Sequence, residues 1–165
     1  MKRNAIVRVL AIGIAAGLAG GVAEVGWISA YAFATGIDAG SVAGGVTDTV
    51  GMAALPPVAG GIAIHMTIAA ILGMALTAAL APLRLESGRR YGVLAGALAA
   101  VWAINFMIVL PLINPAFVEI VPLSVSFVSK LLFGMAAAAS LQFSQRAEPM
   151  RVRAYRPRGV IVQPL

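Results

Sequence analysis

The sequence predicts an all-α integral membrane protein with four transmembrane helices in a bundle, and three observations support this fold class. Hydrophobic residues make up 61% of the 165 residues and charged residues only 11%, with a mean hydropathy of +0.95. A soluble domain has about a quarter of its residues charged. The chain also contains four apolar runs that are each long enough, at about 20 residues, to cross the hydrocarbon core of a bilayer. Finally, nearly all basic residues flank these runs on one side.

The spans are placed by the apolar runs and by the prolines beside them. Pro57 suits the first turn of the second span, Pro82 follows the end of that span, and Pro111 with Pro115 is expected to end the third. We therefore expect a transmembrane domain over residues 1–143. Its spans are expected at about residues 6–33, 58–80, 91–112 and 123–143.

The beginning of the chain has a second interpretation, because a basic start followed by an apolar run is typical of a secretory signal peptide. Arg8 interrupts the start of that run, however, and the apolar character continues to Phe33. A membrane span is therefore the favoured interpretation. The Gly-rich segment 36–57 is expected on the outer side, where Asp38 suits the N-cap of a short surface helix. An ordered connecting loop is the equal alternative.

Orientation follows from lysine and arginine, because cytoplasmic loops carry an excess of both. All but one of the 12 basic residues lie before span one, between spans two and three, or after span four. We therefore expect both termini in the cytoplasm, with residues 144–165 as a basic tail. The chain resembles small bacterial inner-membrane proteins only in this general way. The tail arginines are expected to contact anionic lipid or a partner: Arg146, Arg151, Arg153, Arg156 and Arg158.

The net charge of +6 does not indicate nucleic-acid binding, because these basic residues flank apolar spans instead of forming one basic face. An alternative for the tail is that Val160–Val162 adds to a partner as an extended strand.

An internal repeat is visible as Gly-Met-Ala within residues 71–80 and again within residues 132–141. It suggests two tandem helical hairpins in the same orientation. Chance recurrence of Gly and Ala is the alternative.

Small residues form stripes at helical spacing. Gly13, Gly17 and Gly21 share one helix face, which ends at Glu24. Such glycines weaken a soluble helix, but in a bilayer they let another helix approach closely. Across the chain, the glycines expected to pack helices together are Gly13, Gly17, Gly21, Gly61, Gly73, Gly92, Gly96 and Gly134.

Polar side chains inside the spans are expensive and therefore mark a candidate site. Glu24, His65, Lys130 and Asn105 fall at a similar depth when each is counted up from the nearest cytoplasmic charge. The functional hypothesis is a Glu24–His65–Lys130 cluster that binds or relays a proton, an ion or a polar ligand. One structural alternative is a Glu24–Lys130 ion pair with His65 hydrogen-bonded beside it. Another is that Lys130 extends to the outer interface and leaves Glu24 protonated. Asn105 is expected on a different face from Gly92 and Gly96, toward a neighbouring molecule.

The sequence offers little for catalysis. With no cysteine and one histidine, the usual nitrogen and sulfur ligand sets for a metal are missing. His65, Met66 and Glu24 could at most share a metal with another chain. The glycines lie in apolar spans, so no phosphate-binding loop is indicated. We expect no enzyme activity, no cofactor and no metal.

The first functional expectation is therefore a non-catalytic accessory or structural subunit of a larger membrane complex, in contact with lipids and other membrane subunits. The alternative is a homo-oligomeric proton-coupled transporter or ion channel that uses Glu24, His65 and Lys130.

Overall fold

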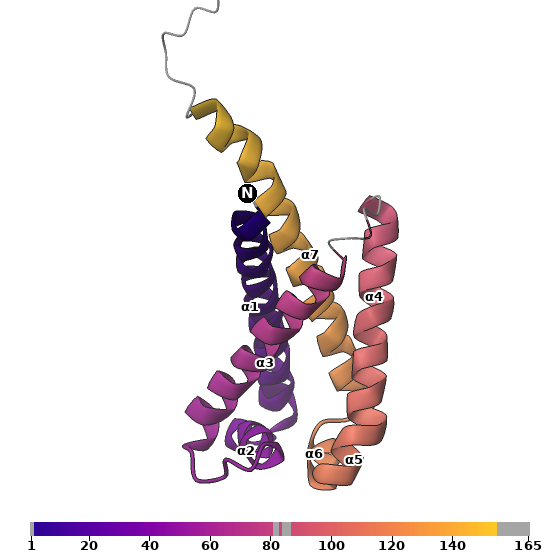
Figure 1. Cartoon of the computed structure of the whole chain (residues 1–165). Helices are drawn as coiled ribbons and strands as arrows, with labels where there is room; N and C mark the ends of the chain where they lie inside the picture. The colour runs from indigo at the N-terminus through magenta and orange to yellow at the C-terminus, as the bar shows by residue number, and fades with distance from the viewer. Residues whose placement is uncertain (1, 81–82, 84–86, 155–165) are drawn as a thin grey trace, which may run out of the picture.

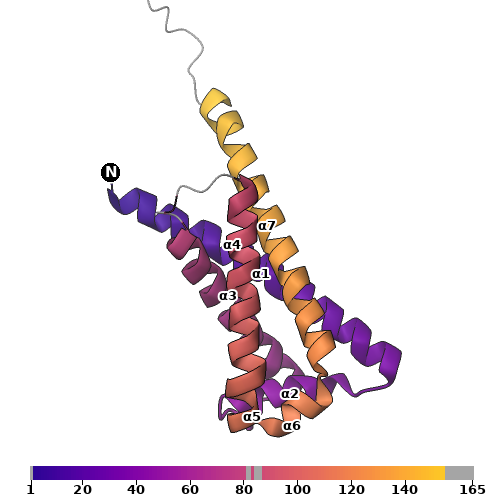
Figure 2. The ribbon, with the colours of Figure 1, turned by 90° about the vertical axis from the view of Figure 1, so that its right-hand side faces the viewer.

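The computed structural model describes residues 2–80, 83 and 87–154, and this part of the chain is helical with no strand. Figures 1 and 2 show long helices that cross one another obliquely, with short helices gathered at one end. In chain order the elements are α1 (Lys2–Thr35), α2 (Ala39–Thr49), α3 (Pro57–Leu80), α4 (Ser87–Ile104), the π-helical turn η2 (Asn105–Val109), α5 (Leu110–Ile113), α6 (Pro115–Ile120) and α7 (Leu123–Ala154).

Four helical stretches are long and apolar enough to cross a membrane, which confirms the multi-span helical class. Their bounds agree with the expected spans to within two residues at either end: Ile6–Thr35, Pro57–Leu80, Tyr91–Ile113 and Leu123–Ser144. The side of the membrane on which the termini lie stays a prediction.

The long helices are arranged around α1. This helix packs against α3 along one side and against α7 along another, while α4 packs on α7 (Figures 1 and 2). In the described part of the chain, α3 and α4 make no extensive contact. Neighbouring spans therefore pair as α1–α3 and α4–α7, and the α1–α7 contact joins the two pairs. One side of the molecule is left open between α3 and α4.

The α1–α3 contact depends on glycine. A Cβ atom added to Gly17 would lie 2.2 Å from the Ala69 carbonyl oxygen, and one added to Gly73 would lie 2.3 Å from the Gly13 oxygen. Any side chain would push the two backbones apart. The close approach of α1 and α3 is therefore the small-residue packing that drives helix association in bilayers.

Other predicted packing glycines divide into two groups. Gly21, Gly61 and Gly134 each face a nearby side chain or backbone group of another helix. Gly92 and Gly96 meet nothing within 4 Å among the described residues. The packing expected for these two α4 glycines is thus not made among the described residues and stays a prediction.

The apolar core lies where α1, α3, α4 and α7 come together. Phe133 of α7 is its largest fully buried side chain, and its ring covers Gly20 of α1 so closely that a Cβ there would clash. The buried cluster consists of Ala16, Ala69, Leu94, Leu98, Phe133 and Ala137.

The short helices close one end of the fold (Figure 2). The expected N-cap is confirmed, because the Asp38 carboxylate accepts a 2.7 Å hydrogen bond from the Ser41 backbone N–H. This bond lowers the pKa of Asp38 below its usual value of 3.8. Asn114 then ties α6 to α2, since its amide nitrogen donates to the Gly45 carbonyl oxygen at 3.1 Å and to Thr49 Oγ1 at 3.0 Å.

The third span ends at Ile113, close to the expected end at about residue 112 and just before Pro115. The helix passes through Pro111 to Ile113, and the preceding turn widens, so that the Leu110 N–H donates to the Asn105 carbonyl. Leu94, Leu98, Phe106 and Leu110 are all buried at spacings that are multiples of four. In a regular α-helix, residues four apart are rotated by about 40° about the helix axis, so this row of side chains would turn away from the core. The wider π-turn offsets part of that rotation.

Helix α7 continues beyond its apolar span to Ala154, so the first half of the expected tail extends the helix. The side chains of Arg146, Arg151 and Arg153 are not described. Arg156, Arg158 and Val160–Val162 lie outside the described residues.

Candidate functional site

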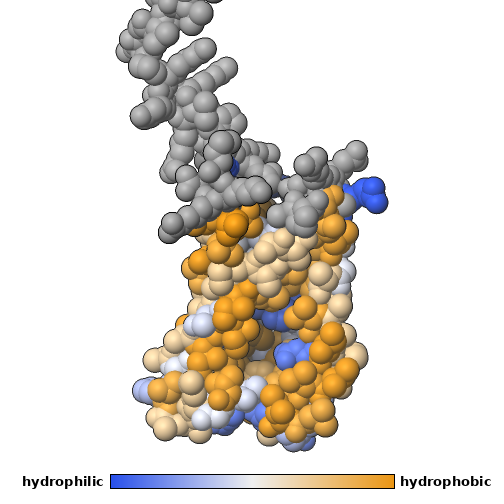
Figure 3. Space-filling model, in the orientation of Figure 1, coloured by the Kyte–Doolittle hydropathy of each residue, from blue (hydrophilic) through white to orange (hydrophobic). Residues whose placement is uncertain are grey.

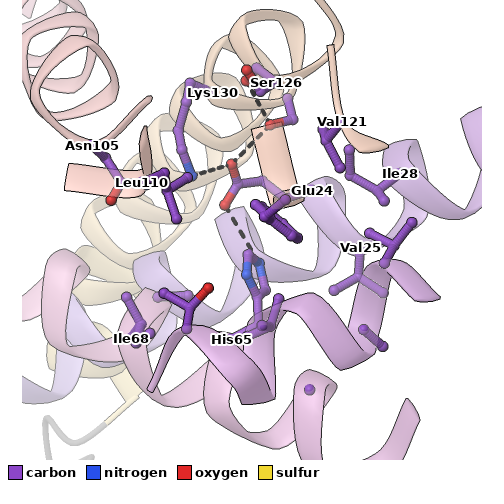
Figure 4. A pocket seen from close by; sticks show the side chains of 18 of the residues that line it. Glu24, Val25, Ile28, His65, Ile68, Asn105, Leu110, Val121, Ser126 and Lys130 are labelled. Atoms are coloured by element: carbon purple, nitrogen blue, oxygen red, sulfur yellow. Dashed lines mark hydrogen bonds and ion pairs between the residues drawn. The ribbon is translucent and has the colours of Figure 1, made fainter. Parts of the chain in front are cut away.

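Glu24 is the centre of the intramembrane polar cluster. Its side chain projects from the end of the glycine face of α1 and is only 3% exposed. Lys130 Nζ of α7 donates to Glu24 Oε1 at 2.5 Å, and Figure 4 shows Lys130 and His65 meeting this carboxylate from different sides. The two opposite charges compensate each other, as buried charges in a bilayer require.

The structure therefore brings together the three ionisable residues that the sequence placed at one depth. Lys130 does not extend to the interface: its side chain is 17% exposed, pairs with Glu24 and lies 5.8 Å from the centre of the Phe133 ring. The alternative in which Lys130 leaves Glu24 alone is not what the structure contains.

His65 lies beside this ion pair. Its Nε2 atom lies 3.5 Å from Glu24 Oε2, but it has no hydrogen-bond partner in the described part of the chain. The structural alternative with a Glu24–Lys130 ion pair and His65 beside it is the arrangement that the structure contains, with no hydrogen bond at Nε2. A buried nitrogen without a partner carries a desolvation cost.

Two serines of α7 belong to the cluster and were not among the predicted site residues. The Ser129 hydroxyl lies 3.2 Å from Glu24 Oε1 and 2.7 Å from the Ser126 carbonyl oxygen, so one proton serves two acceptors. Ser126 Oγ accepts from Trp102 Nε1 of α4 at 3.0 Å. Ser126 lies four residues before Lys130, about one helical turn away, and Ser129 lies directly before it. This closeness to Lys130 in the sequence was the signal that could have identified both serines.

Glu24, His65, Lys130, Ser126 and Ser129 line a cavity of about 560 Å³ between the helices, with walls from α1 to α7 and η2. Figure 3 shows it as a hollow between α3 and α4, with hydrophilic residues inside and hydrophobic residues on both edges. Val42 and Val46 of α2, with Phe117 of α6, lie at the closed end. The cavity therefore opens sideways, toward what would be lipid in a membrane.

Asn105 also lines this cavity, from the first position of the π-turn (Figure 4). It does not bond to Glu24, His65 or Lys130. Its side-chain amide makes no hydrogen bond to any of the described residues. The expectation that Asn105 faces away from this chain is not what the structure contains, since it faces the cavity.

The described residues include no group of three or more His, Cys, Asp or Glu side chains that could hold a metal ion. The polar groups described above are an ion pair, an imidazole, an amide and two serine hydroxyls around an otherwise apolar cavity.

Fold and site together define a multi-pass helical membrane protein with a compensated ion pair inside its spans. Comparisons with protein-family models, curated proteins and solved structures found no match to this chain.

Proposed function

We propose that this protein is a small non-catalytic subunit of a larger complex in the bacterial inner membrane, with both termini in the cytoplasm. The observation that carries the proposal is the bare face of α4. Gly92 and Gly96 are exposed and meet nothing within 4 Å among the described residues. Ala99 and Ala103 continue the same face at helical spacing. By contrast, the Gly13–Gly17–Gly21 face of α1 is filled by α3.

The position of α4 supports the same proposal. It packs on α7 through Leu94 and Leu98, and the Gly92–Gly96 face points the opposite way. A Gly-x-x-x-Gly face lets the backbone of a second helix approach closely, and close packing is what drives association in lipid. A helix from another subunit fits this surface better than loosely packed lipid tails.

The test is purification of the tagged full-length chain in mild detergent, followed by identification and quantification of every co-eluting chain. A Gly92→Leu/Gly96→Leu variant is expected to lose a stoichiometric partner. Gly26→Leu is the matched control, because Gly26 of α1 is likewise exposed with nothing within 4 Å among the described residues. A chain that elutes alone, or a partner retained equally by both variants, would refute the subunit role.

The second candidate is a homo-oligomeric proton-coupled transporter or ion channel. It is favoured by the Glu24–Lys130–His65 cluster, since ionisable residues on a cavity wall inside a membrane often form proton or ion routes. Reconstituted protein would then carry proton or ion flux, and Glu24→Gln would abolish it without unfolding the protein. Absence of flux from a symmetric oligomer in liposomes would exclude this candidate.

A further inference from the structure

We infer that the cavity between α3 and α4 binds a neutral lipid-like molecule whose head carries a carbonyl or hydroxyl group. The head lies beside Asn105 and His65, and the apolar chain leaves between the two helices. A quinone and an acylglycerol both have this chemistry. The inference does not depend on the subunit role, because the Gly92–Gly96 face lies on the opposite side of α4 from Asn105.

Size and shape favour a small ligand over a protein segment. Ligand cavities commonly measure about 300–1,000 Å³, and this one measures about 560 Å³. A transmembrane helix needs a path about 30 Å long and about 10 Å wide. The Asn114 bonds between α6 and α2 close one end of the cavity, which favours a small ligand over such a segment.

Unused hydrogen-bonding groups show where the ligand head belongs. Thr49, Ser126 and Ser129 line the cavity, and each is satisfied by hydrogen bonds within the chain. For Ser29 and Asn105 the described residues supply no such bond. His65 Nε2 is buried against Glu24 Oε2 at 3.5 Å, so the imidazole lines the cavity beside the head without offering this nitrogen to it. An unpaired amide is costly in a bilayer, because lipid tails offer it no partner. Asn105 can both donate and accept, which matches a carbonyl or a hydroxyl.

The local backbone supports the same location. Asn105 begins the π-turn, and such turns frequently occur at functional sites. The wider turn keeps Leu110 buried while Asn105 faces the cavity. The chain thus departs from regular α-helix beside its unpaired amide.

The charges beside the cavity and the apolar side chains at its opening indicate the class of ligand. Lys130 is already neutralised by Glu24 at 2.5 Å, so an anionic head would have to displace a buried carboxylate. A neutral head needs no such exchange. The edges of the opening carry exposed apolar side chains, Ile62 and Ile68 on α3 and Ile104 on α4. They suit an acyl or isoprenoid chain that reaches the cavity from the bilayer (Figure 3).

The experiment adds three probes separately to the detergent-purified full-length protein and measures binding by native mass spectrometry. The probes are decylubiquinone, dioleoylglycerol and anionic dioleoylphosphatidylglycerol. One neutral probe is expected to bind with one molecule per chain, and its identity distinguishes a quinone from an acylglycerol. The anionic lipid is expected not to compete. Absence of binding by both neutral probes, or equal binding by the anionic lipid, would overturn the inference.

Two variants locate the site. Asn105→Leu removes the amide, and Ile62→Trp narrows the opening. Each variant is expected to weaken binding by about tenfold or more, which for Asn105→Leu corresponds to the loss of about one hydrogen bond. Thr67→Val and Ile71→Trp are the matched controls, because both lie on α3 outside the cavity lining.

Thermal unfolding separates this role from a structural one. Asn105→Leu removes a polar group that has no partner, so its Tm is expected to equal or exceed that of the wild type. Binding unchanged in Asn105→Leu, or a lowered Tm in that variant, would contradict the assignment of the amide to a ligand.

Discussion

Removal of the positive charge at Lys130 is the sharpest test of the intramembrane cluster. Lys130→Met keeps the length and apolar stem of the side chain while leaving Glu24 without its cation. Since Glu24 is 3% exposed and loses a 2.5 Å contact, the carboxylate is left with the Ser129 hydroxyl at 3.2 Å and the His65 ring at 3.5 Å as its polar neighbours. Removing one partner of a buried pair costs about 3–5 kcal/mol. For a protein of this length that corresponds to a Tm lower by about 6–20 °C.

The reverse change is expected to cost less. In Glu24→Gln the amide retains a contact for Ser129, and the flexible Lys130 stem allows its ammonium to move toward the interface. The double variant, Glu24→Gln with Lys130→Met, removes both charges and is expected to recover most of the stability lost in Lys130→Met alone.

The assay is thermal unfolding in detergent, followed by the fluorescence of the two tryptophans, Trp27 and Trp102, which both donate hydrogen bonds to α7. Met135→Leu, on the exposed face of the same helix, is the control and should leave the Tm unchanged. A Lys130→Met protein as stable as the control, or a double variant whose loss equals the sum of the single losses, would show that the pair is not coupled.

Three further predictions follow from the packing and the short helices. Gly17→Ala is expected to lower the Tm, because its Cβ would lie 2.2 Å from the Ala69 oxygen. The Cβ of Gly92→Ala meets no described atom, so this change is expected to stabilise α4 by up to about 1 kcal/mol. Equal effects of the two variants on the Tm would disprove the packing difference. Asn114→Leu removes both bonds to α2 and is expected to speed backbone hydrogen exchange in Ala39–Thr49, while unchanged exchange would mean that α6 does not hold α2. The pKa of Asp38 is lowered in the folded state, so its contribution to stability is present above the usual value of 3.8 and is lost as pH falls through the folded value. The stability difference between the wild type and Asp38→Asn should therefore shrink on acidification, and a constant difference would count against this.

The spans and the ion pair could be predicted because both depend on local sequence. Hydropathy locates a span regardless of what packs beside it. The helical repeat of 3.6 residues places Glu24 on the same face as Gly13, Gly17 and Gly21. Depth, counted from the basic residues that flank each span, then aligned Glu24 with Lys130. No knowledge of which helices pack together was needed for either inference.

The cavity could not be predicted in the same way. It exists because α3 leans on α1 while α4 leans on α7, and the apolar pattern of Ile62 or Ile104 is the same whether these residues face a helix or an opening. The π-turn was missed for a different reason. Proline lacks an N–H and commonly ends a helix, but Pro111 follows a turn that is already widened, so the helix continues.

The long sequence separation of the ion pair has a consequence for synthesis. Glu24 and Lys130 are 106 residues apart, an interval that the ribosome covers in about 5–20 seconds. Throughout that interval the first helix is without Lys130, the cation that pairs with Glu24 in the folded chain. The ion pair therefore forms only after α7 has been synthesised, and a truncated product that ends before α7 lacks it.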